Sequence, residues 1–267
     1  MQLSAQRRLQ RAQTFDEIAD LYHQARREPP GWLYDTLFAE FEIDARVARV
    51  LEIGCGTGKS TLPLARRGAK ILALEMGANL ARLARRQLAG FPEVEVLCTR
   101  FENWDPSPQF DLVVAITAWH WLDPAVRCRH AAAALKPGGV LAFTTGGHAY
   151  PPGYDSFFAE IQECYLAIGA DPIPWPPPPP EAVPDSCAEI EQSNCFCDVR
   201  VIRRLWSEEF TAGEYVALMR TASDHRLMDP DKREWLFDQM RRRIELRPGG
   251  RIRKHIITLL HLARRLP

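Results

Sequence analysis

An apolar run that ends in three alternating glycines constrains the fold of this chain more than any other stretch. Residues 47–53 have the largely apolar character of a buried strand, and Gly54, Gly56 and Gly58 follow directly. A helix-like segment, 60–67, comes next, so the stretch predicts a strand, a tight turn and a helix start. Glycines suit such a turn because they adopt positive φ and lack a Cβ, so a ligand can approach the free N–H groups of the helix start.

The spacing of these glycines decides between candidate ligands. The dinucleotide fingerprint G-x-G-x-x-G is not satisfied, and the phosphate-binding P-loop is one residue short, because Gly54 lies only four positions before Gly58. The pattern E-x-G-x-G-x-G resembles motif I of the class I S-adenosylmethionine (SAM)-dependent methyltransferases, in which this loop lies under the amino-acid part of SAM. The resemblance assigns this part of the site to Glu52, Gly54, Cys55, Gly56 and Gly58. The alternative is a glycine-rich turn that binds no ligand.

A second apolar strand, 69–75, ends in Glu75, one βα unit after the glycine turn. A carboxylate at this place accepts both ribose hydroxyls, so we expect Glu75 to bind the ribose and Met76 to line the adenosine side. The loop after a third strand, 94–97, holds the adenine in the resembled family. Because Arg100 stands where many relatives carry Asp, the resemblance implies Phe101 and Glu102 as contacts. Helix capping or core packing is the alternative role for both.

A fourth apolar run, 110–117, has the character of a strand buried on both faces of a parallel sheet. Residues 118–124 follow at the carboxyl edge, where ligands lie in open α/β sheets, and they resemble a segment of the same family. The residues expected beside SAM are Ile116, Thr117, Ala118 and His120. His120 is a candidate catalytic base, although a histidine in an apolar segment more often packs against its neighbours.

The first 28 residues are predicted to be helical, with Phe15 and Tyr22 on one face. The string F-D-x-x-A-x-x-Y, with Arg26 downstream, resembles the lead segment of small-molecule methyltransferases related to trans-aconitate methyltransferase. In such relatives the segment folds over SAM, which implies that Tyr22 and Arg26 approach its carboxylate. The family's A-R-P-x-Y-P is altered at residues 25–30, so Arg27 is the alternative to Arg26. The segment is otherwise a helix packed on the core.

The remaining motifs complete an α/β pattern. A Leu-Lys-Pro-Gly-Gly turn, 135–139, leads into a fifth strand, 140–145, and further strands are expected at 196–206 and 252–262. Helices are expected at 154–168, 211–219 and 232–244, and the proline-rich loop 172–180 has no assigned role. Residues 220–225 resemble a turn that closes the acceptor pocket in the same relatives, which makes His225 a second catalytic candidate, with His148 also available.

These patterns predict an α/β fold, namely the doubly wound, mostly parallel seven-stranded sheet of the Rossmann-like methyltransferase fold with a helical cap. The division expected by role is a helical segment covering the cofactor (1–44), a SAM-binding core (45–148), a cap or acceptor region with strand 6 (149–250) and a last strand (251–267).

Charge and cysteine content limit the partners and the compartment. The chain has 34 basic and 34 acidic residues, so no net charge favours nucleic acid or a membrane surface, and no apolar run approaches the roughly 18 residues that span a bilayer. Seven cysteines and a polar, Arg-rich start without a signal peptide predict a reduced protein of the cytoplasm. Cys195 and Cys197 lie near Cys187, but no spaced His completes a ligand set, so we expect no metal site.

The resemblance implies transfer of the SAM methyl group to an O, N or C atom of a small, hydrophobic or aromatic metabolite, with S-adenosylhomocysteine as product. Transfer would depend mainly on proximity, with or without a histidine base. The alternative is a SAM-binding fold that does not methylate, such as a regulatory or binding module or a SAM-dependent cyclase. The expected partner is the small-molecule acceptor, and the sequence does not set the oligomeric state.

Overall fold

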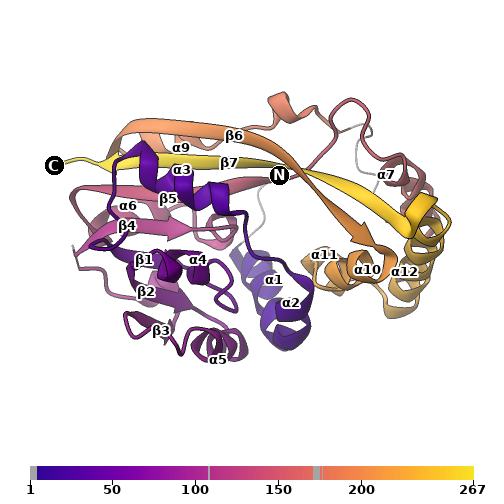
Figure 1. The fold of residues 1–267 in the computed structure, drawn as a ribbon, viewed down its shortest axis with the longest axis horizontal. Helices are drawn as coiled ribbons and strands as arrows, with labels where there is room; N and C mark the ends of the chain where they lie inside the picture. The colour runs from indigo at the N-terminus through magenta and orange to yellow at the C-terminus, as the bar shows by residue number, and fades with distance from the viewer. Residues whose placement is uncertain (1–4, 108, 171–174, 176) are drawn as a thin grey trace. The chain divides into compact units, whose positions relative to one another are not determined.

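A seven-stranded sheet is the central feature of the computed structural model, which describes residues 5–107, 109–170, 175 and 177–267. The strand order is β3-β2-β1-β4-β5-β7-β6 (Figure 1). β1 pairs in parallel with β2 and β4, β2 with β3, and β4 with β5. The predicted fold class, an α/β protein with a mostly parallel seven-stranded sheet, is therefore confirmed.

The elements follow the predicted alternation of strands and helices. The strands are β1 (Arg49–Ile53), β2 (Lys70–Glu75), β3 (Val94–Cys98), β4 (Phe110–Ala115), β5 (Leu135–Ala149), β6 (Phe196–Thr211) and β7 (Arg251–Arg265). The α-helices are α1 (Ala5–Glu17), α2 (Ala19–Ala25), α3 (Gly31–Glu40), α4 (Thr61–Arg66), α5 (Ala78–Gln87), α6 (Arg127–Ala134), α7 (Phe157–Glu160), α8 (Gln162–Ala167), α9 (Cys187–Gln192), α10 (Ala212–Arg220), α11 (Ser223–Arg226) and α12 (Pro230–Glu245). Short 3₁₀ turns lie at Phe101–Asn103, Trp119–Trp121, Pro180–Ala182 and Pro248–Gly250.

The chain divides into two compact units. Unit 1 comprises Met1–Thr145, Asp185–Ile202 and Leu259–Pro267, and unit 2 comprises Gly146–Pro184 and Arg203–Thr258. These units are defined by contacts within the fold, whereas the boundaries expected after residues 44, 148 and 250 refer to roles, so that division stays a prediction.

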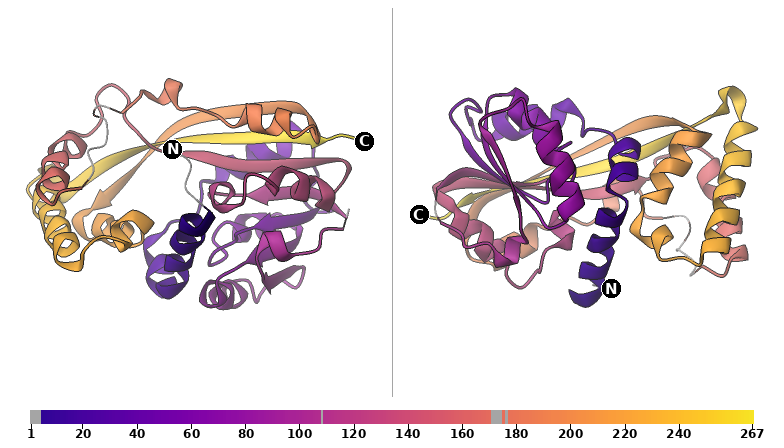
Figure 2. Two further views of the ribbon diagram at one scale, coloured as in Figure 1. Left: turned by 180° about the vertical axis from the view of Figure 1, so that it is seen from behind. Right: turned by 90° about the horizontal axis from the view of Figure 1, so that it is seen from below.

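The core of unit 1 lies on both faces of the sheet. Because successive strand residues point to opposite faces, Val50 joins one apolar cluster and Leu51 the other. Helices α3, α4 and α5 supply the first cluster, and α6 and α9 supply the second. Figure 2 shows helices on either side of these strands. This arrangement is the doubly wound pattern, and it leaves the carboxyl ends of β1, β2 and β4 at one edge.

Predicted elements in the first 150 residues differ from the structure in three details. The single helix expected over residues 1–28 is two helices, α1 and α2, which are separated at Ile18. The expected fourth strand ends at Ala115 instead of residue 117, because Thr117 has φ +54° and cannot continue an extended strand. The Leu-Lys-Pro-Gly-Gly segment is an irregularity inside β5, where the pairing moves from Phe110 with Leu135 to residue 112 with residue 140.

Unit 2 has its own apolar core. Its buried side chains come from α7, α8, α10 and α12, with Phe157, Leu236 and Met240 among the most buried. The helix expected at 154–168 is divided into α7 and α8. Part of the proline-rich loop 172–180 lies outside the described residues.

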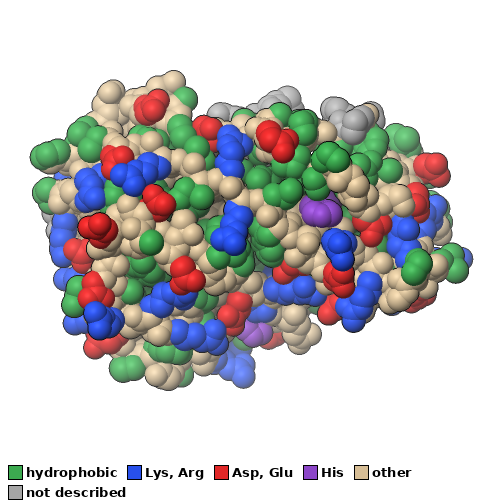
Figure 3. Space-filling model, turned by 45° about the horizontal axis from the view of Figure 1, so that its top comes forward, with side chains coloured by type: hydrophobic (Ala, Val, Ile, Leu, Met, Phe, Trp, Pro, Cys, Tyr) green, Lys and Arg blue, Asp and Glu red, His purple; other side chains and the backbone are tan. Residues whose placement is uncertain are grey.

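The surface carries both signs of charge. On the face drawn in Figure 3, basic and acidic side chains are interspersed. Among the described residues, no helix has the combined length and hydrophobicity of a membrane-spanning segment.

Candidate functional site

The turn between β1 and α4 uses its three glycines for different purposes. Gly54, Gly56 and Gly58 all have positive φ, at 70°, 57° and 85°. A Cβ on Gly54 would lie 2.7 Å from the Cβ of Ala118, and a Cβ on Gly58 would lie 3.3 Å from the Cα of Ala84. Those two glycines therefore allow close packing. A Cβ on Gly56 would meet nothing nearer than a Tyr22 ring carbon at 3.9 Å, so this is the glycine whose backbone faces open space.

Glu75 connects the glycine turn to the end of β2. Its Oε2 accepts a hydrogen bond from the Gly56 N–H at 2.8 Å, and its Oε1 accepts one from the Gly77 N–H at 2.8 Å. The side chain is 6% exposed, and burial raises its pKa although these two backbone bonds oppose the shift. Each carboxylate oxygen keeps capacity for a second hydrogen bond, so the group can accept from a ligand without losing its backbone partners.

Glu52 is a fully buried carboxyl group on β1. Burial raises its pKa to about 7, against the opposing influence of the Ser60 and Thr61 side chains. The Ser60 and Thr61 hydroxyls lie close enough to lower that pKa as hydrogen-bond donors, but neither meets the geometry of a full hydrogen bond, so within the described residues neither carboxylate oxygen has a well-formed partner. A buried polar group without a partner is costly, and a donor supplied by a ligand or an ordered water removes that cost.

The N-terminal helices cover the glycine turn. Tyr22 of α2 lies beside Gly56, and the guanidinium of Arg26 stacks 5.3 Å from the Tyr22 ring centre. The His23 Nδ1 lies 3.0 Å from the Thr57 hydroxyl, and Lys59 donates to the Arg26 carbonyl. The structure thus brings Tyr22 and Arg26 to the glycine turn, while their approach to the SAM carboxylate stays a prediction. Arg26 is half-buried whereas Arg27 is exposed, which favours Arg26 in the predicted role.

Asp16, the Asp of the F-D-x-x-A-x-x-Y string, has a role in this region that the sequence analysis did not assign. Its Oδ1 accepts from the N–H groups of Asn79 and Leu80 at 2.8 and 3.0 Å, so a side chain of α1 caps the start of α5. A Cβ on Gly77 would lie 2.6 Å from the same oxygen, so only glycine leaves room for the cap. The sequence offered one hint of this contact. The residue before α5 is Gly77, which has no side chain to cap the helix, so the cap has to come from another part of the chain.

The segment after β4 contains the residues that were predicted to face the reacting methyl group. Thr117, an exposed residue with φ +54°, donates its N–H to the Thr144 hydroxyl at 2.8 Å, while Ile116 and Ala118 are buried. Positive φ at a non-glycine residue is strained and is common at functional sites. The Trp121 ring contacts Phe15 of α1 edge-on at 5.5 Å, so the N-terminal helix reaches this segment too.

His120 has an exposed surface, yet the surrounding protein lowers its pKa to about 4, mainly by desolvation and secondly through the Arg127 charge. The imidazole is therefore neutral at pH 7 and can accept a proton.

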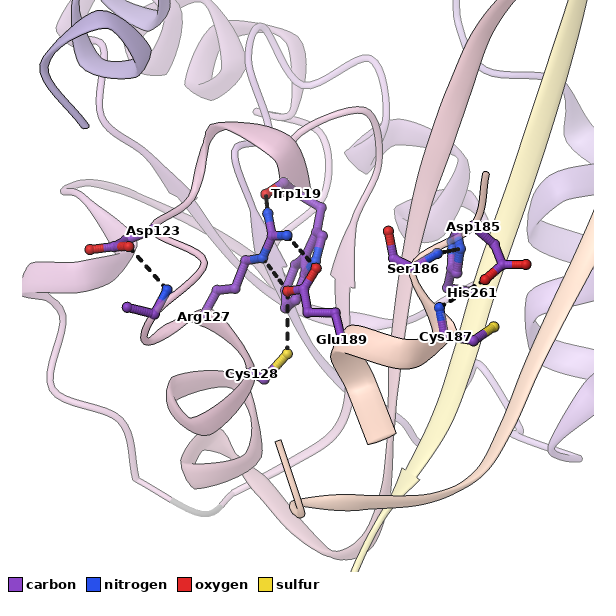
Figure 4. A network of polar contacts seen from close by, with 10 residues as sticks. Trp119, Asp123, Arg127, Cys128, Asp185, Ser186, Cys187, Glu189 and His261 are labelled. Atoms are coloured by element: carbon purple, nitrogen blue, oxygen red, sulfur yellow. Dashed lines mark hydrogen bonds and ion pairs between the residues drawn. The ribbon is translucent and has the colours of Figure 1, made fainter. Parts of the chain in front are cut away.

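Arg127 fixes the backbone of this segment, and sequence reasoning missed it. Figure 4 shows its guanidinium between the Trp119 carbonyl, at 2.7 Å from Nη1, and the carboxylate of Glu189, whose Oε1 lies 2.5 Å from Nε. The Cys128 thiol donates to the same Glu189 oxygen at 3.6 Å. A bidentate pair of this kind is strong and directional, so α9 holds the 119–121 turn through Arg127.

Three predicted cofactor contacts have structural roles. Phe101 is buried and packs edge-on against His130 at 4.8 Å. Glu102 accepts from the Asp123 N–H at 3.2 Å and pairs with Arg100 at 3.6 Å. The buried Cys55 directs its thiol toward the Gly56 carbonyl. Met76 is half-buried next to Glu75. Their assignment to the SAM site stays a prediction.

The other catalytic candidates lie in unit 2. His225 is 4% exposed, its Nε2 accepts from the Tyr165 hydroxyl at 2.8 Å, and its Nδ1 lies 3.1 Å from Asp224. Both of its ring nitrogens are therefore engaged. The Nδ1 of His148 lies 2.9 Å from the Tyr150 hydroxyl, and burial lowers the pKa of His148 to about 3. His225 can therefore act as a base only through the Tyr165 hydroxyl or after rearrangement.

The residues around the glycine turn fit SAM. The open backbone at Gly56 leaves room for the ligand, and the Glu75 carboxylate can accept hydroxyl groups. The seven-stranded sheet has the Rossmann-like methyltransferase fold, and the residues around its glycine turn suit SAM as cofactor. The comparisons agree, since residues 50–139 match a protein family described as a methyltransferase domain.

Curated relatives are similar over the same region. A ubiquinone biosynthesis O-methyltransferase from Bradyrhizobium diazoefficiens is 32% identical over 123 residues, which is 43% of this chain and 49% of the relative. A trans-aconitate 2-methyltransferase from an Azoarcus species is 36% identical over 131 residues, 48% of this chain and 46% of the relative. The chain thus spans about half the length or less of these relatives.

A solved structure extends the comparison of folds. Phosphoethanolamine N-methyltransferase 2 from Haemonchus contortus, in complex with phosphomonomethylethanolamine and S-adenosylhomocysteine, superposes with a TM-score of 0.55 at 18% identity. The match covers 99% of this chain and 61% of that one. At this identity the likeness concerns the fold alone.

Proposed function

We propose that this protein transfers the methyl group of SAM to an O, N or C atom of a small, hydrophobic or aromatic metabolite. One observation carries the proposal: the Glu75 carboxylate is bonded to the Gly56 N–H, under the cover of Tyr22. A carboxylate that can accept hydrogen bonds from hydroxyl groups, an open stretch of backbone and an aromatic ring therefore lie together. They lie at the carboxyl edge of the sheet, where ligands of α/β folds bind.

The chain's own residues would hold and orient the reactants. Bound SAM supplies an electrophilic methyl group on its sulfonium. Glu75 would accept the ribose hydroxyls, and Tyr22 and Arg26 would lie near the SAM carboxylate, where α2 would limit the access of water to the bound cofactor. If the acceptor is a hydroxyl group, neutral His120 would take up its proton, and for an amine or a carboxylate no base is needed.

The first experiment measures SAM binding by calorimetry on the purified chain. Glu75→Ala should weaken binding about 10- to 100-fold, the scale for losing hydrogen bonds to a charged group. Glu95→Ala is the matched control, because Glu95 is an exposed carboxylate on β3, and it should bind as wild type. Gly56→Val should abolish SAM binding. Gly68→Val, at a glycine that also has positive φ, should lower the stability of the fold through backbone strain but leave the SAM affinity of the folded protein unchanged.

A second measurement tests the reaction itself. Release of S-adenosylhomocysteine is followed with a panel of small hydroxyl, carboxyl and amine acceptors. Folded protein that binds neither SAM nor S-adenosylhomocysteine would overturn the proposal. Binding without methyl transfer to any acceptor would instead favour the non-methylating alternative.

The proposal extends to the setting of the protein. Its acceptor is a small molecule, and its compartment is the cytoplasm, which is supported by seven cysteines, none of which is assigned to a disulfide.

A further inference from the structure

A cluster of three metal-ligating side chains lies in unit 1, apart from the glycine turn. Asp185 and Cys187 come from the turn that begins α9, and His261 comes from β7. One ligand atom from each, a carboxylate oxygen, a thiol sulfur and an imidazole nitrogen, lies within 4.8 Å of the other two. Figure 4 shows the three side chains gathered around Ser186.

The tautomer of His261 suits metal binding. The Ser186 N–H donates to its Nε2 at 2.9 Å, so Nε2 carries a lone pair directed at the turn, and Nδ1 carries the proton of the neutral ring. The imidazole is fully buried and stacks on the Phe143 ring at 4.6 Å with an angle of 8°. A metal requires an unprotonated and oriented nitrogen, and packing supplies both the tautomer and the orientation here.

We propose that Asp185, Cys187 and His261 bind one Zn²⁺ ion. A thiolate, an imidazole and a carboxylate match the borderline-soft Zn²⁺ and not Mg²⁺ or Ca²⁺, which prefer oxygen alone. The two anionic ligands neutralise the charge of the ion. Three protein ligands leave the fourth tetrahedral position to water.

The geometry needs only a small adjustment. Zn²⁺ bonds of about 2.0–2.3 Å in a tetrahedron separate ligand atoms by about 3.3–3.8 Å, so the present spread of up to 4.8 Å must close by roughly 1 Å. Asp185 is exposed and Cys187 is half-buried, so their side chains can rotate toward the buried His261 and the ion can enter from solvent. The ion would replace the Ser186 hydrogen bond, whose net worth is only about 1 kcal/mol. Zinc would then fasten the start of α9 to β7.

The test is a Co²⁺ titration of the reduced, metal-free, untagged full chain. A cysteine thiolate on tetrahedral Co²⁺ gives a near-ultraviolet charge-transfer band and visible d–d bands, and Zn²⁺ should displace both. Cys187→Ser should remove the charge-transfer band. Cys195→Ser, at a half-buried thiol of the same unit, should keep it. Asp185→Asn should keep the band but weaken Co²⁺ affinity at least about tenfold, the lower bound for losing a supporting group.

Thermal unfolding supplies a second measurement. Zn²⁺ should raise the unfolding temperature of wild type and of Cys195→Ser, and should leave that of Cys187→Ser unchanged, because an ion stabilises only the state that binds it. The proposal is wrong if wild type gives no charge-transfer band at saturating Co²⁺, or if the band survives Cys187→Ser.

Discussion

The buried carboxyl group of Glu52 makes the stability of the ligand-free protein depend on pH in a defined way. Its pKa is about 7 in the folded protein and 4.5 ordinarily, because burial disfavours the charged form. The folded state therefore binds the proton more tightly than the unfolded state. The stabilising contribution is complete below about pH 4.5 and is lost as the pH rises through about 7. The difference of about 2.5 pKa units corresponds to about 3 kcal/mol.

Glu52→Gln removes this titration and keeps the shape of the side chain. The quantity to compare is the difference in unfolding free energy between wild type and the variant. We expect this difference to fall by about 3 kcal/mol as the pH rises from about 4.5 to about 8. Urea unfolding of the ligand-free protein at several pH values measures both curves. Glu95→Gln, at an exposed carboxylate, should run parallel to wild type. Parallel curves for wild type and Glu52→Gln would refute the reasoning.

Three further substitutions test the site. Gly54→Ala should destabilise the fold by about 2–5 kcal/mol in urea unfolding, because residue 54 has positive φ and its new Cβ would lie 2.7 Å from the Cβ of Ala118. Gly90→Ala, where a Cβ meets open space, should be nearly neutral, and equal effects of the two substitutions would contradict the packing argument. Asp16→Ala should cost about 1 kcal/mol of stability through loss of the α5 cap, and an unchanged unfolding midpoint would argue against the cap. His120→Asn should lower turnover about 10²- to 10⁴-fold at nearly unchanged SAM affinity if His120 is the base, and a turnover within about threefold of wild type would remove it from the mechanism.

The sequence was most informative where a single local pattern carries the structure. The apolar runs ending at Ile53 and Glu75 became β1 and β2, whose last residues agree with the prediction, and the glycines between strand and helix adopted positive φ. The errors in the predicted elements occurred where contacts with distant segments determine the local structure. The break at Ile18 and the irregularity within β5 depend on what those segments pack against, which periodicity does not contain.

The site shows the same division. Glu75 could be singled out as a candidate ligand because a strand-terminal acid after a glycine turn has a local signature, and the structure places it at the end of β2 against the Gly56 N–H. The structural roles of Phe101 and Glu102 could not be separated from ligand contacts, since both kinds of residue look alike in a sequence. The expectation of no metal site rested on sequence spacing, whereas the proposed zinc ligand His261 bonds Ser186 from 75 positions away.

The sequence by itself therefore determined the class of fold and the cofactor loop, because backbone sterics and side-chain periodicity act over a few residues. The tertiary structure alone decided the partners of the charged groups. Asp16 caps a helix whose Asn79 lies 63 positions away, and Arg127 meets Glu189 at a separation of 62. It also decided the burial that raises the pKa of Glu52. Such pairings depend on where the packed layers bring distant segments together. Separation along the chain does not indicate which segments will be close in space.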